Sequence, residues 1–194
     1  MKKSFLINSL LVGLTITLFS FDTPSSWFSA GSKPKSYEMG IEKGAGQNGK
    51  NAATIKSIDK KIDGFGTLMQ QCIPDKYLGK KIKMSAFVKT ENVSNWAGLW
   101  LRVDQKGSNQ PLSFDNMGDR PIKGTTNWTK YEIILDVPNT AWLIAYGALL
   151  DGTGQIWFDN ITFEIVSDFS PSTGSSYMKK SPTVDEPTNL DFEN

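Results

Sequence analysis

The chain has 194 residues, with 21 lysines and arginines against 20 aspartates and glutamates, so its formal net charge is +1. It contains no histidine and one cysteine. These counts exclude Ser-His-Asp and Cys-His nucleophile pairs, His-ligated metal sites, cysteine-cluster metal sites and an internal disulfide. A nearly neutral chain gives no reason to expect a nucleic-acid partner.

Residues 1–21 have the pattern of a secretory signal peptide. Lys2 and Lys3 precede an apolar stretch that runs from Phe5 to Phe21. This stretch is near the lower length limit of a membrane span, so an uncleaved N-terminal anchor is the competing interpretation. We therefore expect an exported protein (periplasmic, at the cell surface or secreted) with no membrane contact beyond this segment. Because Cys72 lies in an alternating apolar run, we expect it to be a small buried hydrophobic residue and not a reactive thiol.

Between Tyr37 and Val166 the chain shows short β-rich runs separated by Gly, Asn, Asp and Pro, and no helical period. Nine short strands without helices predict an all-β fold, a jelly-roll β-sandwich that spans residues 22–166. The expected strands are Tyr37–Ile41, Ala52–Ser57, Gly66–Ile73, Lys80–Thr90, Trp96–Asp104, Pro111–Asn116, Thr129–Val137, Ala141–Leu149 and Gln155–Val166.

Alternation along the strands predicts which side chains face the core. In Lys80–Thr90, four apolar residues share one face: Ile82, Met84, Ala86 and Val88. In the last strand the apolar phase shifts by one residue between Phe158 and Ile161. A single extra residue would reconcile the two phases, so we expect a β-bulge near Asp159–Asn160.

Residues 167–188 are rich in Ser, Thr and Pro and poor in apolar residues. This composition is typical of a linker. Such a tail buries little apolar surface, so deletion of Ser167–Asn194 is expected to leave the melting temperature nearly unchanged.

Four blocks of the sequence resemble a known type of bacterial accessory domain. They are AGLWLRVD (97–104), FDNM (114–117), KGTTNWTKYEIILDVP (123–138) and ALLDGTGQIWFDNITFE (148–164). The domain has a galactose-binding-like jelly-roll fold, akin to carbohydrate-binding modules, and occurs in secreted proteins beside peptidase- or esterase-like domains and also beside AraC-type regulators. The resemblance covers about Trp27 to Val166. It implies a non-catalytic module and leaves the ligand open.

The string PTNLDFEN (187–194) is similar to the opening strand of the same domain type. We interpret residues 189–194 as the start of a truncated second module, the alternative being a chance match. At the other end of the chain, Phe21–Asp22 stands where the opening strand would fall and is merged with the signal segment.

The residues Trp100, Arg102 and Asp104 alternate with three apolar residues, so they share one face of a strand. An indole stacks on the apolar face of a sugar ring, and Arg and Asp hydrogen-bond to its hydroxyl groups. Asp115 and Asn116 are expected to join from a neighbouring strand. The alternative is an Arg102–Asp104 ion pair with Trp100 packed under a loop.

The other bulky aromatic candidates are Trp27, Phe28, Trp96, Trp128, Trp142 and Trp157. We expect Trp128, which precedes a strand, to be a core residue that closes one end of the sandwich. Trp157 faces away from its apolar neighbours Ile156 and Phe158, as either a surface platform or the cover of a sheet edge; the sequence leaves these two alternatives open.

The resemblance also implies a structural calcium held by Asp159 of the last strand together with oxygens of the first strand, because calcium takes carboxylate and carbonyl oxygens. The competing interpretation, which we favour, is that Asp159 accepts hydrogen bonds from local backbone amides at the bulge. We expect no other cofactor.

Together these features predict a monomeric, non-catalytic module for a carbohydrate or another polyhydroxylated ligand. The alternative is a structural or protein-interaction domain left over from a larger secreted peptidase- or esterase-like protein. A glycosidase needs two carboxylates across a cleft, and no such pair stands in a motif here.

Overall fold

The computed structural model of the protein describes residues 21–175 and 186–193. The signal segment, apart from its last residue Phe21, lies outside these residues. The strands are β1 (Phe28–Gly31), β2 (Tyr37–Glu42), β3 (Ala52–Ser57), β4 (Phe65–Cys72), β5 (Lys80–Gln105), β6 (Pro111–Asp115), β7 (Ile122–Val137), β8 (Ala141–Asp151) and β9 (Gln155–Val166). Three single-turn 3₁₀ helices, η1 (Pro34–Ser36), η2 (Gln47–Gly49) and η3 (Asp75–Tyr77), lie in the connections. Within the described residues, no helix is long and apolar enough to cross a membrane.

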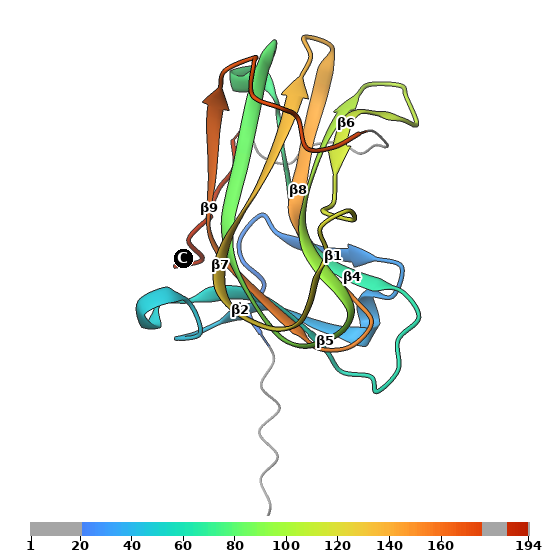
Figure 1. Ribbon diagram of the computed structural model, residues 1–194, viewed down its shortest axis with the longest axis vertical. Helices are drawn as coiled ribbons and strands as arrows, with labels where there is room; N and C mark the ends of the chain where they lie inside the picture. Colours follow the sequence, from blue (N-terminus) through green and yellow to red (C-terminus); the bar gives the residue numbers. More distant parts are fainter. Residues whose placement is uncertain (1–20, 176–185, 194) are drawn as a thin grey trace, which may run out of the picture.

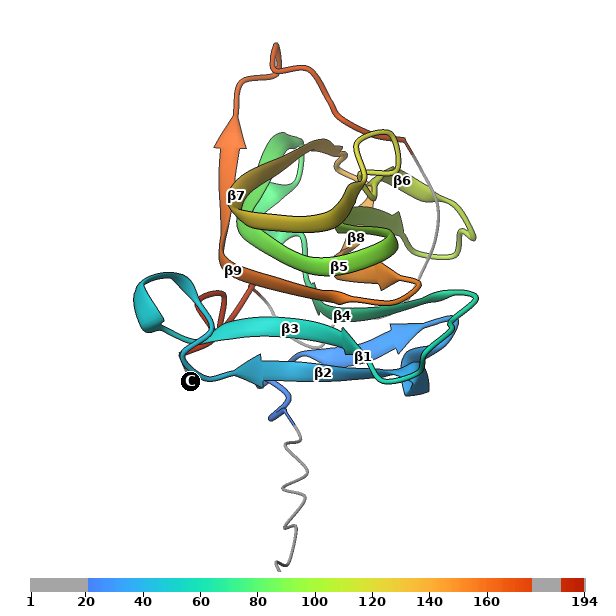
Figure 2. The same ribbon diagram turned by 60° about the horizontal axis from the view of Figure 1, so that its bottom comes forward.

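The strand β5 belongs to both layers of the sandwich. Its first half pairs with β7 on one side and with β9 on the other, and β9 continues to β3 and β2. From Trp96 onward it pairs with β8 and β6, and β8 continues to β4 and β1. We call the first layer the β7 sheet and the second the β8 sheet. Figure 1 shows the long strands side by side, and Figure 2 shows β1, β2, β3 and β4 together below them.

The interior follows the predicted alternation. The four residues expected on the core face of β5, from Ile82 to Val88, are at most 1% exposed. The predicted bulge in β9 is confirmed, because two residues of β9, Asn160 and Ile161, oppose the single residue Ala86 of β5 between the pairs Ser85–Thr162 and Phe87–Asp159. Asn160, at the bulge, has a φ of 53°, in the left-handed region that Asn tolerates better than most residues. The all-β jelly-roll prediction is therefore confirmed.

Besides shifts of one or two residues at several strand ends, the strands differ from the prediction in three larger ways. The runs Lys80–Thr90 and Trp96–Asp104 form one strand, because the polar stretch between them still pairs, with Glu91 opposite Gln155 and Val93 opposite Gly124. The strand β7 begins at Ile122 instead of Thr129. The short edge strand β1 was not predicted, because four residues with mostly exposed side chains carry no alternation signal.

The C-terminal segment, residues 186–193, packs into this sandwich. The side chain of Phe192 is fully buried, and its ring centroid lies 5.4 Å from those of both Trp27 and Phe158. The backbone N–H of Ile161 in β9 donates to the carbonyl of Leu190 at 3.1 Å. The interpretation of residues 189–194 as the start of a separate module is therefore corrected: residues 189–193 complete the core of the module that precedes them. The segment ends beside the loop between β2 and β3 (Figures 1 and 2).

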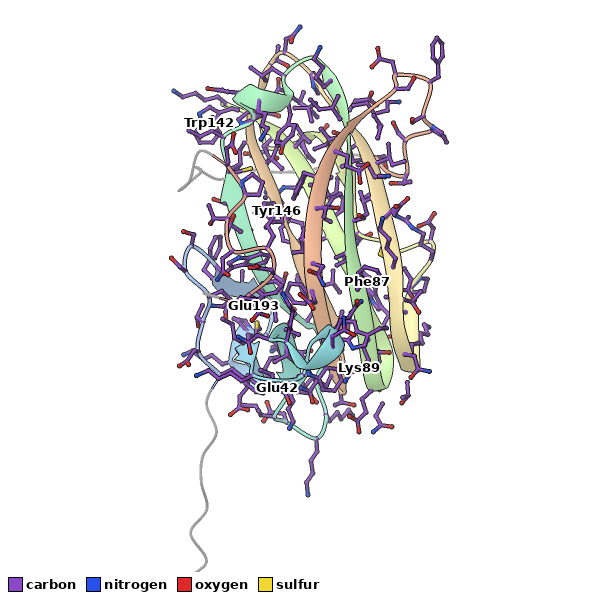
Figure 3. The ribbon with its side chains drawn as sticks, turned by 90° about the vertical axis from the view of Figure 1, so that its left-hand side faces the viewer. Glu42, Phe87, Lys89, Trp142, Tyr146 and Glu193 are labelled. Atoms are coloured by element: carbon purple, nitrogen blue, oxygen red, sulfur yellow. The ribbon has the colours of Figure 1, made fainter. Side chains whose placement is uncertain are left out.

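Hydrogen bonds from β4, β8 and the loop between β2 and β3 hold the same segment or its partner Gln70. Gln70 Nε2 donates to the carbonyl of Thr188 at 3.1 Å, and the Thr188 N–H donates back to Gln70 Oε1 at 2.9 Å. The hydroxyl of Tyr146, labelled in Figure 3 with Glu193 below it, also donates to Gln70 Oε1. The backbone N–H of Asn51 donates to Glu193 Oε1 at 2.8 Å.

The start of the predicted linker is docked as well. The Thr173 N–H donates to the carbonyl of Ile134 at 2.8 Å, and the Ile134 N–H donates to Thr173 Oγ1 at 2.9 Å. Composition alone did not predict these contacts, because a few residues can satisfy the open edge of β7 without any apolar pattern. Residues 176–185 of the predicted linker lie outside the described residues.

Replacing Phe192 by Ala is predicted to destabilise the protein by about 3–5 kcal/mol, because the change empties a buried aromatic site. The melting temperature should fall by roughly 6–20 °C, at about 2–4 °C per kcal/mol for a protein of this size. Phe169→Ala is the matched control, since Phe169 is 98% exposed in the same tail. Equal melting temperatures for both variants would show that the C-terminal segment is not docked.

Cys72 is predicted to be unreactive in the folded protein. Its side chain is fully buried, and burial, with a further contribution from the negative charge of Glu186, raises the pKa of the thiol to about 12. The reactive thiolate is therefore scarce at pH 8. The test is a thiol assay with Ellman's reagent, which should detect one thiol per chain only after denaturation. Rapid reaction under native conditions would contradict the buried placement.

Candidate functional site

A groove with a volume of about 420 Å³ lies on the outer face of the β8 sheet. This volume is within the range of sites that bind small molecules. Most of the lining is aromatic or aliphatic, with a few polar side chains. The lining residues are Phe28, Ala30, Gly31, Phe65, Thr67, Met69, Gln71, Trp96, Trp100, Arg102, Phe114, Asn116 and Leu149.

The strand register explains how residues far apart in sequence reach the groove. In β5, Trp100 and Arg102 point away from the core because their neighbours Leu99, Leu101 and Val103 are completely buried inside it. Arg102 is opposite Phe114 of β6 on one side and Ala145 of β8 on the other. Side chains directly opposite each other on antiparallel strands share a face.

The small residue Gly147 lets two strands approach closely beneath the groove. Gly147 of β8 is opposite Trp100 of β5 and Met69 of β4. A Cβ atom added at Gly147 would lie only 2.2 Å from the carbonyl oxygen of Leu68, so any other residue would push β8 away from β4.

Trp100 forms the floor of the groove. Its side chain is only 7% exposed, and its Nε1–H donates to Thr67 Oγ1 at 2.8 Å. The Thr67 hydroxyl in turn donates to the carbonyl of Ala148 at 2.6 Å. Trp100 is therefore a fixed, buried ring and not the exposed stacking platform that the sequence indicated. Its replacement by Ala would remove a buried side chain, so it would perturb stability and binding together.

Four other aromatic side chains have exposed or half-exposed rings in the groove: Phe28, Phe65, Trp96 and Phe114. Of these, the sequence singled out Phe28 and Trp96 only as bulky candidates. The contributions of β4 were missed, because both faces of this strand are buried and its alternation shows no polar side.

Arg102 and Asp104 form the ion pair of the alternative interpretation, with Arg102 Nε 3.1 Å from Asp104 Oδ2. The Asp104 side chain is 1% exposed and does not line the groove, whereas that of Arg102 is 22% exposed and does. Each of the two interpretations of this strand is therefore correct in part. The Arg102–Asp104 ion pair exists, and the Arg102 side chain also faces the groove.

Asp115 and Asn116, which were expected to join the site together, face opposite sides of the β8 sheet. Asn116 lines the groove, but Asp115 is buried opposite Leu101, on the core-facing side of β6. Asp115 Oδ1 accepts the backbone N–H of Met117 at 2.7 Å, and its carboxylate pairs with Arg120. Asp115 therefore stabilises the loop after β6, and its prediction as a groove residue is wrong because adjacent strand residues face opposite sides.

Trp157 is a buried part of the β7 sheet and not a surface platform. It is 5% exposed, and its Nε1–H donates to Glu42 Oε2 at 2.7 Å. The Lys89 ammonium lies 4.2 Å from its ring centroid and 5.7 Å from that of Trp128.

Trp128 is half-buried and packs outside the core, so its prediction as a core residue is wrong. Figure 3 shows Glu42 and Lys89 on the side of the molecule that carries β9.

Asp159 is buried at the bulge and accepts backbone hydrogen bonds from Asn160, at 2.6 Å, and from Gln47, at 3.4 Å. Burial raises the pKa of the Asp159 carboxyl, the two amide donors oppose this, and the negative charge of Glu193 adds to the rise. Among the described residues, no group of three or more Asp, Glu, His or Cys side chains is placed to hold a metal. These contacts fit a hydrogen-bonded carboxyl more closely than a calcium ligand, because both oxygens already accept N–H groups.

Comparisons with known proteins find one relative in sequence and several solved structures with a similar fold. No family model matches the chain. It is 44% identical over 168 residues to a Bacillus subtilis (strain 168) protein named as the uncharacterized HTH-type transcriptional regulator YbfP. The match covers 86% of this chain and 56% of that protein, so the chain spans little more than half the length of its relative.

Two solved structures with this fold contain carbohydrate-binding modules. The CBM22-1–GH10 modules of Clostridium thermocellum xylanase 10B, solved with xylohexaose, match with a TM-score of 0.54 and 16% identity, over 76% of this chain and 28% of that one. The CBM22-1 xylan-binding domain of Paenibacillus barcinonensis Xyn10C matches with a TM-score of 0.52 and 14% identity, over 75% and 88%.

A third structure with the same fold is an enzyme. The Stig cyclase Fisc of Fischerella sp. TAU matches with a TM-score of 0.51 and 14% identity, over 80% of this chain and 93% of that one. At these identities the three likenesses show the jelly-roll fold alone.

Calcium is predicted to stabilise the protein only modestly. A calcium site needs six to eight oxygens, and Asp159 with Glu193 supplies two carboxylates that are already hydrogen-bonded. The test compares melting curves in excess chelator and in millimolar calcium. A rise of about ten degrees or more that disappears in Asp159→Ala would show a complete calcium site and would contradict this prediction.

Proposed function

We propose that this chain is a non-catalytic ligand-binding module and that the groove of the β8 sheet takes a short carbohydrate or a similar polyhydroxylated ligand. The observation that carries the proposal is the composition of the groove. Half-exposed aromatic rings from β4, β5 and β6 surround a few polar side chains in one concavity.

This composition suits the two kinds of surface on a sugar. The C–H faces of a pyranose ring pack on aromatic rings such as Trp96 and Phe114, and its hydroxyl groups exchange hydrogen bonds with Arg102, Asn116 and Gln71. The rings are held by strands and not by long loops, so little side-chain ordering is needed on binding. The carbohydrate-binding modules that share the fold are consistent with this assignment.

The groove lining also favours binding over catalysis. Among the described residues, those that line it include no Asp, Glu, Cys, Ser, Lys or Tyr. General acid–base or nucleophilic catalysis draws on such side chains. Arg102 provides charge and hydrogen bonds but does not exchange a proton near neutral pH.

The similarity to a regulator supports a second, related role as a ligand sensor. A helix-turn-helix reads DNA with an α-helix, and the helices of the described residues are three 3₁₀ turns of three residues each. We infer that the region shared with the Bacillus protein contributes ligand recognition, and that DNA contact there depends on the part this chain does not match. A ligand sensor and an exported binding module would both use the groove of the β8 sheet. That this chain is exported is a separate proposal, which rests on the signal-like pattern of residues 1–21.

Trp96→Ala is predicted to weaken oligosaccharide binding about five- to tenfold, because one stacking ring contributes about 1–1.5 kcal/mol. A glycan array first identifies an oligosaccharide that binds, and calorimetry then gives its affinity for each variant. Trp128→Ala is the matched control, because Trp128 is also half-buried but lies in the β7 sheet outside the groove.

Three outcomes separate the proposals. Loss of affinity in Trp96→Ala but not in Trp128→Ala supports the groove as the site. Equal affinity in both variants would place the sugar elsewhere. An array without any binder would favour the alternative of a structural or protein-interaction domain.

A further inference from the structure

We propose that the ligand of the groove carries a carboxylate and that Arg102 recognises it, so that the preferred carbohydrates are uronic-acid-containing oligosaccharides. This inference rests on the proposed function of the groove and specifies the chemical class of its ligand. It is argued from the charges and hydrogen-bonding groups that the groove presents.

Charge is the first observation. Arg102 is the one charged side chain among the described residues that line the groove. Its partner Asp104 is buried behind it and bonds the guanidinium at Nε, 3.1 Å away. This bond runs from Nε, and the Arg102 side chain is 22% exposed. A guanidinium held at one corner in this way still offers a pair of N–H groups, which matches the two oxygens of a carboxylate.

The balance of donors and acceptors is the second observation. Asn116 Oδ1 accepts the backbone N–H of Gly118 at 3.1 Å, which uses one of its two lone pairs, whereas the NH₂ end of the side chain offers two donors. The Thr67 hydroxyl donates its one proton to the carbonyl of Ala148 and accepts the Trp100 Nε1–H, so one lone pair is all that it still offers a ligand. Donors therefore remain on Arg102, Asn116, Gln71 and the Trp96 indole, whereas the side-chain acceptors are the Gln71 oxygen and one lone pair each on Asn116 and Thr67.

Such a donor-rich groove discriminates between ligands. A hydroxyl group must donate as well as accept, and it finds few side-chain acceptors here. A carboxylate only accepts, and its bonds to a guanidinium are charge-assisted. No lining carboxylate repels an anion, and the nearest acidic group of the strand is already paired with Arg102.

The test is calorimetry with matched probes. Short oligomers of galacturonate, glucuronate, mannuronate and guluronate are each compared with their methyl esters, which keep the sugar backbone and remove the charge. Neutral xylohexaose and cellohexaose complete the panel. We expect at least one acidic oligomer to bind at least tenfold tighter than its ester, and to lose affinity between 20 mM and 500 mM salt while neutral probes do not.

The variants are chosen so that the fold survives. Arg102→Gln alone would remove the cation that faces the buried carboxylate of Asp104, so the double variant Arg102→Gln/Asp104→Asn replaces the ion pair by two neutral amides. It should reduce the acid-to-ester ratio to about one. Arg102→Lys should keep part of the preference, and Lys89→Gln, which removes a cation from the β7 sheet, should keep all of it.

Each result decides the inference. An acid-to-ester ratio that persists in the folded double variant, or tightest binding of a neutral probe, overturns the role of Arg102. If neutral probes bind and Trp96→Ala weakens them, the groove function stands without the carboxylate preference. If no probe binds, the groove function and the carboxylate preference both fail.

Discussion

The whole arrangement depends on one strand that serves two sheets. The 26 residues of β5 pair with β7 and β9 in the first half and with β8 and β6 in the second half. The alternation of inward and outward side chains along β5 therefore has to suit first the β7 sheet and then the β8 sheet. The inward residues fill the common core along the entire strand, and the outward residues of the second half, Trp100 and Arg102, become the floor and the cation of the groove. A change that shifted this strand by one residue would exchange core and groove.

The C-terminal segment shows that the core is completed from a distance. Phe192 lies between Trp27, near the start of the described chain, and Phe158 of the last strand. Gln70 holds Thr188 from β4, and the residues on either side of Gln70, Met69 and Gln71, line the groove on the opposite face. The docked segment and the groove thus rest on the two faces of one strand, so the stability of one supports the geometry of the other.

The fold was largely predictable because short amphipathic strands leave a clear pattern of alternation. The same rule placed Trp100 and Arg102 on one outward face. It failed for Asp115, which the sequence grouped with Asn116 although adjacent strand residues point to opposite sides. It also failed for β4, whose two buried faces hide the lining residues Phe65, Thr67 and Gln71. The burial of Phe192 could not be predicted, because composition records how polar a segment is but not where its one aromatic side chain packs.

The central claim is that the groove of the β8 sheet, and not the surface of the β7 sheet where Lys89 lies over Trp128 and Trp157, is the ligand site. The most direct measurement is a ¹H–¹⁵N correlation spectrum of the tryptophan indole groups during titration with an oligosaccharide that binds. The chain has six tryptophans, and each can be assigned by substitution. The signals of Trp96 and Trp100 should move, while those of Trp128 and Trp157 stay in place. Movement of Trp128 and Trp157 with Trp96 and Trp100 unchanged would contradict the account.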